Sequence, residues 1–219
     1  MGDKVPKNYV SNKDETVRMF KSNFLESLSR VHWTVPLILY IPIIIYLIYK
    51  SYTINNLDVK TILYFIIAGI IIWTFTEYTL HRFIFHYEPK SKWGKRLHFI
   101  VHGVHHDYPK DSRRLVMPPS VSIPLALIFY GLFLWILGNE HISSFFAGFL
   151  IGYLFYDTTH YAIHHFTMHN KFWLLIKNHH LKHHYQNSAK GFGVSQPTWD
   201  YVFGTTFQNN KETFQEDTK

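Results

Sequence analysis

Histidines gather in four short stretches of this chain, and their spacing indicates metal chemistry. The chain has 16 histidines among 219 residues. The clusters are HRFIFH with His81 and His86, HGVHH with His102, His105 and His106, HYAIH with His160 and His164, and HLKHH with His180, His183 and His184. Neutral imidazole is the commonest metal ligand in proteins and suits iron, zinc and copper. Ten such rings are too many for one ion, so the sequence predicts a site for two.

The spacing within each cluster predicts how the rings are presented. Residues three and four apart share a face of a helix, so the last three clusters should each form one imidazole face. His81 and His86 are five apart, which requires either an irregular turn or two separate metals. Spacing alone leaves four further histidines ambiguous, namely His98, His165, His169 and His179.

The residue types near the clusters narrow the kind of site. The chain has no cysteine, which excludes disulfides, thiolate catalysis and cysteine-type zinc sites. Carboxylates are almost absent from the clusters, so the site should be nearly all histidine. Solvated or core histidines, or a loose metal-sequestering patch, are the competing interpretation. Clustering next to the ends of apolar segments favours a shared site.

Four apolar segments must position these clusters. They cover about residues 35–52, 61–80, 120–138 and 142–157. A spanning helix needs about 20 apolar residues, which the second segment meets easily, whereas the short fourth segment could be buried or re-entrant. The predicted fold is an all-α integral membrane protein, with four transmembrane helices and a cytoplasmic helical cap that holds a histidine-rich di-metal site. The predicted domains are a tail with a surface amphipathic helix at 1–33, a membrane domain at 34–207, and a polar C-terminal tail at 208–219.

The basic residues predict the orientation. The formal net charge is +7, which suits either nucleic acid or an anionic membrane surface, and the apolar segments favour the membrane over nucleic acid. Lys and Arg concentrate in residues 1–34, in 81–118 and in the C-terminal region. Both termini and the histidine clusters are therefore predicted to be cytoplasmic. In the first of these regions Val17, Phe20, Phe24 and Leu28 recur at helical spacing, which predicts a helix on the membrane surface.

Four stretches of the sequence together resemble a known family. They are EYTLHRFIFH, LHFIVHGVHHDYPKDSRRLVMPP, LFYDTTHYAIHH and NHHLKHHYQNSAKGFGVSQPTWDYVFGT. With the helices between them they cover residues 60–207 and resemble the fatty acid hydroxylase branch of the sterol desaturase and hydroxylase superfamily. The MPP segment narrows the resemblance towards fatty acid 2-hydroxylases that act on the acyl chain of sphingolipids.

The resemblance implies which residues do the chemistry. It implies that the ten clustered histidines are ligands of two metal ions. As ligands, it favours His102 over His98 and His180 over His179. It also implies a substrate-binding role for Tyr156 and Asp157. Some relatives carry a haem domain for which this chain has no room, so a separate electron-donor protein is expected.

The implied reaction sets the expected cofactors. Hydroxylating carbon 2 of an acyl chain breaks an unactivated C–H bond, which needs a redox metal and O2. Zinc has no redox chemistry, so two iron ions are expected in the active enzyme, even if a purified sample contains zinc. Glu77, Asp107 and Asp200 are candidates to orient the rings. The segment with Gly191 and Gly193 is expected to fold over the site.

Other functions share part of this pattern. A sterol or carotenoid hydroxylase or a desaturase would use the same metal site. A four-helix haem cytochrome needs only two to four histidines within its spans, and a passive metal transporter needs polar residues along its spans. The expected membrane is either the bacterial inner membrane or the endoplasmic reticulum. Lys90, Lys92, Lys95 and Arg96 are expected to contact anionic lipid, and docking of an acidic electron donor is the second interpretation.

Overall fold

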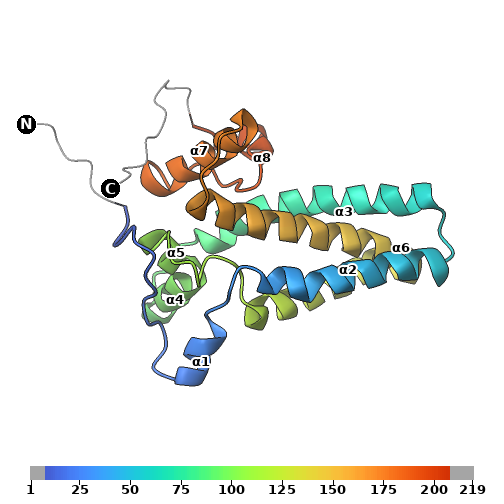
Figure 1. The fold of residues 1–219 in the computed structure, drawn as a ribbon, viewed down its shortest axis with the longest axis horizontal. Coiled ribbons are helices and arrows are strands. Elements are labelled where there is room, and N and C mark those ends of the chain that lie inside the picture. Colours follow the sequence, from blue (N-terminus) through green and yellow to red (C-terminus); the bar gives the residue numbers. More distant parts are fainter. Residues whose placement is uncertain (1–7, 208–219) are drawn as a thin grey trace, which may run out of the picture. The chain divides into compact units, whose positions relative to one another are not determined.

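The computed structural model describes residues 8–207, and this part of the chain is helical without β-strands (Figure 1). The predicted C-terminal tail at 208–219 lies outside the described residues. The elements in chain order are α1 (Asn23–Leu28), α2 (Val35–Thr53), α3 (Val59–Thr79), the π-helix η1 (Leu80–Phe85), α4 (Lys92–His98), the π-helix η2 (Phe99–Gly103), α5 (Val104–Asp107), α6 (Pro119–His165), α7 (Lys171–Tyr185) and α8 (Thr198–Val202). The all-α prediction is confirmed.

The chain forms two compact units. One, the apolar unit, comprises residues 18–77 and 116–158. The other, the histidine unit, comprises residues 78–115 and 159 onwards, together with the residues before 18. All four histidine clusters belong to the histidine unit, although they are far apart in sequence.

Three helical segments are long and apolar enough to cross a membrane. They are Val35–Thr53, Val59–Phe85 and Pro119–His165. The first two match the predicted spans at 35–52 and 61–80, although the second runs to Phe85 because η1 continues α3 without a break. The third covers both remaining predicted spans, so the described structure has three candidate spanning segments where four were predicted.

The third segment is bent sharply in its middle. Gly138 has φ 69° and ψ 179°, a non-helical conformation that is essentially confined to glycine. The Tyr130 and Phe146 ring centroids lie 5.1 Å apart, as do those of Phe133 and Phe149. Residues 16 positions apart in a straight helix would be separated by about 24 Å. The two halves of α6 therefore fold back on each other, and the bend lies where the third predicted span ends.

Close helix packing and polar contacts hold the apolar unit together. A Cβ atom at Gly148 would collide with the backbone of Ile66, so α3 and the second half of α6 approach through a glycine. Small residues allow this kind of backbone approach in membrane helices. On α2, the Tyr40 hydroxyl donates to Ser122 Oγ over 2.9 Å. Asn55 donates to the Glu140 carbonyl over 2.6 Å, which ties the α2–α3 link to the bend.

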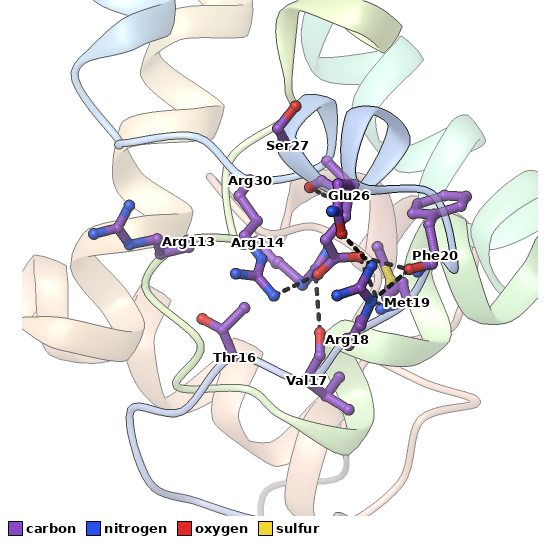
Figure 2. Close-up of polar contacts among 12 residues, drawn as sticks. Thr16, Val17, Arg18, Met19, Phe20, Glu26, Ser27, Arg30, Arg113 and Arg114 are labelled. Atoms are coloured by element: carbon purple, nitrogen blue, oxygen red, sulfur yellow. Dashed lines mark hydrogen bonds and ion pairs between the residues drawn. The ribbon is translucent and has the colours of Figure 1, made fainter.

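The surface helix predicted near the N-terminus is much shorter than its apolar pattern suggests. It covers only Asn23–Leu28, so Val17 and Phe20 lie in the segment before it. Glu26 explains this, because its carboxylate accepts from the backbone N–H groups of Met19 and Phe20 over 3.0 and 2.9 Å (Figure 2). These bonds fold the preceding segment back onto α1 in place of a further helical turn.

Candidate metal centre

The ten predicted histidines come together in two groups of five. The first group is His81, His86, His102, His106 and His183, and the second is His105, His160, His164, His180 and His184. Within each group the potential ligand nitrogens all lie within 4.8 Å of one another. The groups adjoin, because the rings of His106 and His184 stack with centroids 4.3 Å apart. Two groups of this kind fit two metal ions.

A π-helical turn brings the first two histidines together. In η1 the His86 amide donates to the His81 carbonyl over 3.1 Å, a bond between residues five apart. This wider turn places residues i and i+5 on one face, and the two Nε2 atoms lie 3.2 Å apart. The irregular turn is therefore the correct alternative, and both rings belong to one group.

The expectation of one imidazole face per cluster is wrong for two clusters. His102 and His106 enter the first group, whereas His105 enters the second. In α7, His183 likewise separates from His180 and His184. Successive residues on an α-helix point about 100° apart, so a His-His pair directs one ring to each group. Within the three clusters that lie after η1, only the pairs four apart stay together.

In the first group, hydrogen bonds to backbone carbonyls direct the lone pairs of two rings towards the other nitrogens. His81 Nδ1 lies 2.5 Å from the carbonyl oxygen of Phe192, and His183 Nδ1 lies 2.6 Å from that of Lys190. A carbonyl oxygen only accepts, so both Nδ1 atoms carry the proton and both Nε2 atoms present lone pairs. His81 Nε2 nevertheless lies 3.1 Å from Nε2 of His102. Converging lone pairs in a buried site are stabilised by a cation between them.

The spacing also fits the size of a transition-metal ion. Nε2 atoms of His81, His86 and His102 form a triangle with sides of 3.1–3.2 Å. In the second group, His160 Nε2 lies 2.9 Å from that of His105. With metal–nitrogen bonds of about 2.1 Å, ligands at right angles would be about 3.0 Å apart and tetrahedral ligands about 3.4 Å. The observed spacing is close to both values, so the converging nitrogens fit the size of such an ion.

The electrostatic environment keeps the rings neutral. Burial, followed by the effect of neighbouring imidazoles, lowers the pKa of His86 to about 3 and of His183 to about 3. The same causes hold the pKa of His105 and His180 well below the ordinary value. Neutral imidazole is the form that binds metals, so these rings are ready to act as ligands at neutral pH.

The segment after α7 orients the first group, as predicted for the Gly191–Gly193 region. It supplies the two carbonyl acceptors, of Lys190 and Phe192, to His183 and His81. Gly191 has φ 71°, which favours glycine. The region is therefore confirmed to fold over the histidines, and it fixes two rings through its backbone.

Asp200 on α8 holds this segment in place. Its buried carboxylate accepts from the amides of Phe192 and Gly193 over 2.9 and 2.8 Å. It also accepts from Thr205 Oγ1 over 2.7 Å and lies 3.0 Å from His179 Nε2. Burial alone would raise the pKa of Asp200, but these hydrogen bonds outweigh it and lower the pKa. Asp200 thus acts on the two rings indirectly, through the segment, and binds a histidine outside both groups.

The remaining predicted residues lie elsewhere. His98 and His179 are in neither group. Tyr156 and Asp157 belong to the apolar unit, on the last turns of α6 before His160. Asp157 is buried and accepts from the Met117 amide and the Tyr153 hydroxyl, both over 3.2 Å.

A polar pocket of about 270 Å³ opens beside the first group. Its lining residues are Arg82, Phe83, His86, Glu88, Ser188, Ala189 and Phe192. His86 is half-buried, whereas all five rings of the second group are buried. The first group is therefore the more accessible of the two.

The family follows from these histidines and from sequence comparison. The profile of the family described as fatty acid hydroxylase matches residues 66–205, which include all ten rings. The chain is a member of the fatty acid hydroxylase family. The resemblance proposed from the four motif stretches is thus confirmed.

Similar members of the fatty acid hydroxylase family have names that specify their reaction. The dihydroceramide fatty acyl 2-hydroxylase FAH1 of Arabidopsis thaliana is 39% identical over 87% of this chain and 80% of its own length. Fatty acid 2-hydroxylase of Mus musculus is 36% identical over 86% of this chain and 56% of its own length. A solved structure, described as full-length scs7p with only the hydroxylase domain visible, is 38% identical with a TM-score of 0.80, over 85% of this chain and 70% of that one.

Proposed function

We propose that this chain hydroxylates carbon 2 of the fatty acyl chain of a ceramide-like lipid, using O2 and electrons from a separate donor protein. The observation that carries the proposal is the pair of five-histidine groups with converging nitrogens, in a member of the fatty acid hydroxylase family. The names of the similar proteins, a dihydroceramide fatty acyl 2-hydroxylase and a fatty acid 2-hydroxylase, support the choice of substrate.

The ten grouped histidines would hold two iron ions, one in each group. Bound iron would supply the activation of O2 that an unactivated C–H bond requires and that no side chain provides. The reaction inserts one oxygen atom into the C–H bond and reduces the other to water, which consumes two electrons and two protons. Zinc in a purified sample would fill the groups without this redox chemistry.

The chain's own residues would orient the metal-binding rings and exclude water from the metal site. The carbonyls of Lys190 and Phe192 fix the tautomers of His183 and His81, so their lone pairs are directed inward. The second group is buried throughout, which keeps water from the reacting centre. The open pocket beside His86 is the route we assign to protons and electrons.

Tyr156 and Asp157 would position the substrate. Both precede His160 by one helical turn on α6, and both are buried. A hydroxyl or amide of a ceramide-like head group could hydrogen-bond to them while the acyl chain lies among apolar helices. Such positioning can supply a large part of a rate enhancement.

The membrane arrangement is part of the proposal. Each half of α6 would cross the bilayer separately, which gives four crossings and returns the histidine unit to the side of the termini. The Lys and Arg distribution supports a cytoplasmic position for that side.

Lipid analysis tests the function. We expect mass spectrometry of a host that expresses the chain to show new 2-hydroxy acyl chains in its ceramide fraction. The His105→Ala variant should abolish the product and lower the bound iron, because one of five donors to the second group is lost. His98→Ala is the matched control, since His98 lies outside both groups.

Other products would redirect the proposal. Altered sterols or carotenoids with unchanged acyl chains would assign the chain to a different substrate. Unchanged hydroxylation in the His105→Ala variant would contradict the shared site.

A further inference from the structure

The helical stretch from α4 through α5 has two chemically opposite faces. One face directs His102, His105 and His106 into the two metal groups. The other presents Trp93 and Leu97, which are 76% and 45% exposed. A helix that supports a buried site normally exposes polar residues on its outer face. The exposed apolar stripe therefore indicates a surface that contacts another molecule or the membrane.

Exposed apolar residues also lie just before and just after this stripe in the chain. Val101 extends it by one turn and is also exposed. Phe83, Ile84 and Tyr87, at the end of η1 and just after it, expose more than half of their side chains. Phe83 and Ile84 are also among the last residues of the spanning segment Val59–Phe85. The exposed apolar surface is therefore continuous in sequence with a helix that can cross the membrane.

Positive charges border the stripe. Lys90, Lys92 and Lys95 are exposed, and Arg96 follows them with its guanidinium 5.8 Å from the centre of the Phe99 ring. Exposed aromatic rings next to lysines are typical of the membrane–water interface, where the rings enter the head-group layer and the lysines attract anionic lipids.

We propose that this surface, defined by Phe83, Ile84, Tyr87, Trp93, Leu97 and Val101 with Lys90, Lys92 and Lys95, lies in the head-group layer and binds anionic lipid. An electron-transfer partner would favour a small, mainly polar contact, whereas this surface exposes six large apolar side chains. The inference does not depend on which reaction the chain catalyses. It implies that the stretch carrying three of the histidines is held at the bilayer surface by its opposite face.

The absence of cysteine allows a clean test with the full chain. Trp93→Cys places a single environment-sensitive fluorophore on the stripe, and Leu97→Cys is a second position in case the first variant folds poorly. Gln186→Cys is the control, because Gln186 is an exposed polar residue outside the pocket that Phe83 lines. Each labelled protein is reconstituted in vesicles of phosphatidylcholine with and without phosphatidylserine, then quenched with aqueous iodide or with nitroxide-labelled lipids.

We expect nitroxide lipids to quench the labels at 93 and 97 strongly and iodide to quench them weakly, with the opposite order at 186. Nitroxide phosphatidylserine should quench the label at 93 more than nitroxide phosphatidylcholine. Replacing Lys92 and Lys95 with Gln should lower that preference by up to about fivefold per lysine.

Three results would contradict the proposal. Iodide quenching at 93 and 97 as strong as at 186 would show that the stripe faces water. An unchanged preference for phosphatidylserine in the Lys92→Gln, Lys95→Gln variant would show that these lysines do not bind anionic lipid. If the label at 93 became shielded only when an acidic redox protein was added, the surface would belong to a protein partner.

Discussion

Replacing Asp200 with Asn should loosen the first metal group although Asp200 contacts none of its rings. The carboxylate accepts from two backbone amides and one hydroxyl and lies within hydrogen-bond distance of His179. The segment that it holds supplies the carbonyls that fix His81 and His183. Asn has nearly the same shape, so the change removes charge and one acceptor without creating a cavity.

The expected loss of stability follows from the four hydrogen-bond partners of the Asp200 carboxylate. Asn keeps one oxygen, which can retain two of the bonds, and presents an NH2 group to the other two partners. Either Thr205 or His179 can turn to accept from this group, but one backbone N–H, of Phe192 or Gly193, is left without a partner. A buried donor left in this way costs about 1–3 kcal/mol, and loss of the charge adds about 1 kcal/mol. We therefore expect the free energy of unfolding to fall by about 2–4 kcal/mol.

The effect on the metal should be selective. Changes in the groups that orient metal ligands typically cost about 10–100-fold in metal affinity. Competition with a graded chelator should thus release one ion early from Asp200→Asn and leave the second ion bound as in the wild type. Thr205→Val is the matched control, because it removes one of the donors to Asp200, together with the bond to the Tyr78 hydroxyl, and should cost about 2 kcal/mol.

Equal loss of both ions would refute the assignment of this segment to the first group. Unchanged affinity for both ions, despite the expected loss of stability, would show that the carbonyls of Lys190 and Phe192 do not control metal binding.

Three further predictions follow from the same structure. The pKa of His183 is about 3 in the folded protein and about 6.5 in an unfolded chain, so the unfolded state binds more protons between pH 3 and pH 6.5. After the metal has been removed with a chelator, the melting temperature should therefore fall as the pH is lowered through this range. Removing metal at pH 7 should lower the melting temperature, since an ion at about 1,000 times its Kd adds about 4 kcal/mol to the folded state, and an unchanged melting curve after complete chelation would contradict this. Gly138→Ala should cost about 1–3 kcal/mol in detergent unfolding because φ is 69° there, whereas Gly131→Ala, where a Cβ meets only open space, should be neutral or slightly stabilising.

The apolar helices were predictable because long hydrophobic runs allow few alternatives. Helical segments cover the predicted regions 35–52 and 61–80, with bounds Val35–Thr53 and Val59–Phe85, and the bend at Gly138 lies at a predicted span end. The length of the surface helix was overestimated because the spacing of apolar residues does not show which hydrogen bonds the backbone makes. The apolar residues concerned are Val17, Phe20, Phe24 and Leu28. The side chain of Glu26 competes for the amides that a longer helix would use.

The composition of the site was predictable, and its division was not. Residue types and clustering identified all ten histidines that the structure brings together. Which ring joins which group depends on the direction of each side chain around its helix, and on packing between segments far apart in sequence. Likewise, the role of Asp200 depends on backbone carbonyls of a loop, which carry no signature in side-chain identity.

The two π-helical turns bear on how this kind of site is recognised in other sequences. In η1 the wide turn accommodates one residue more than an α-helical turn, while the rings of His81 and His86 still converge. A chain with three residues between the two histidines could reach the same arrangement with an ordinary α-helical turn. Insertion or deletion of a single residue there is therefore a change of helix type, and motif searches that require one fixed gap would separate proteins whose metal-binding geometry is the same.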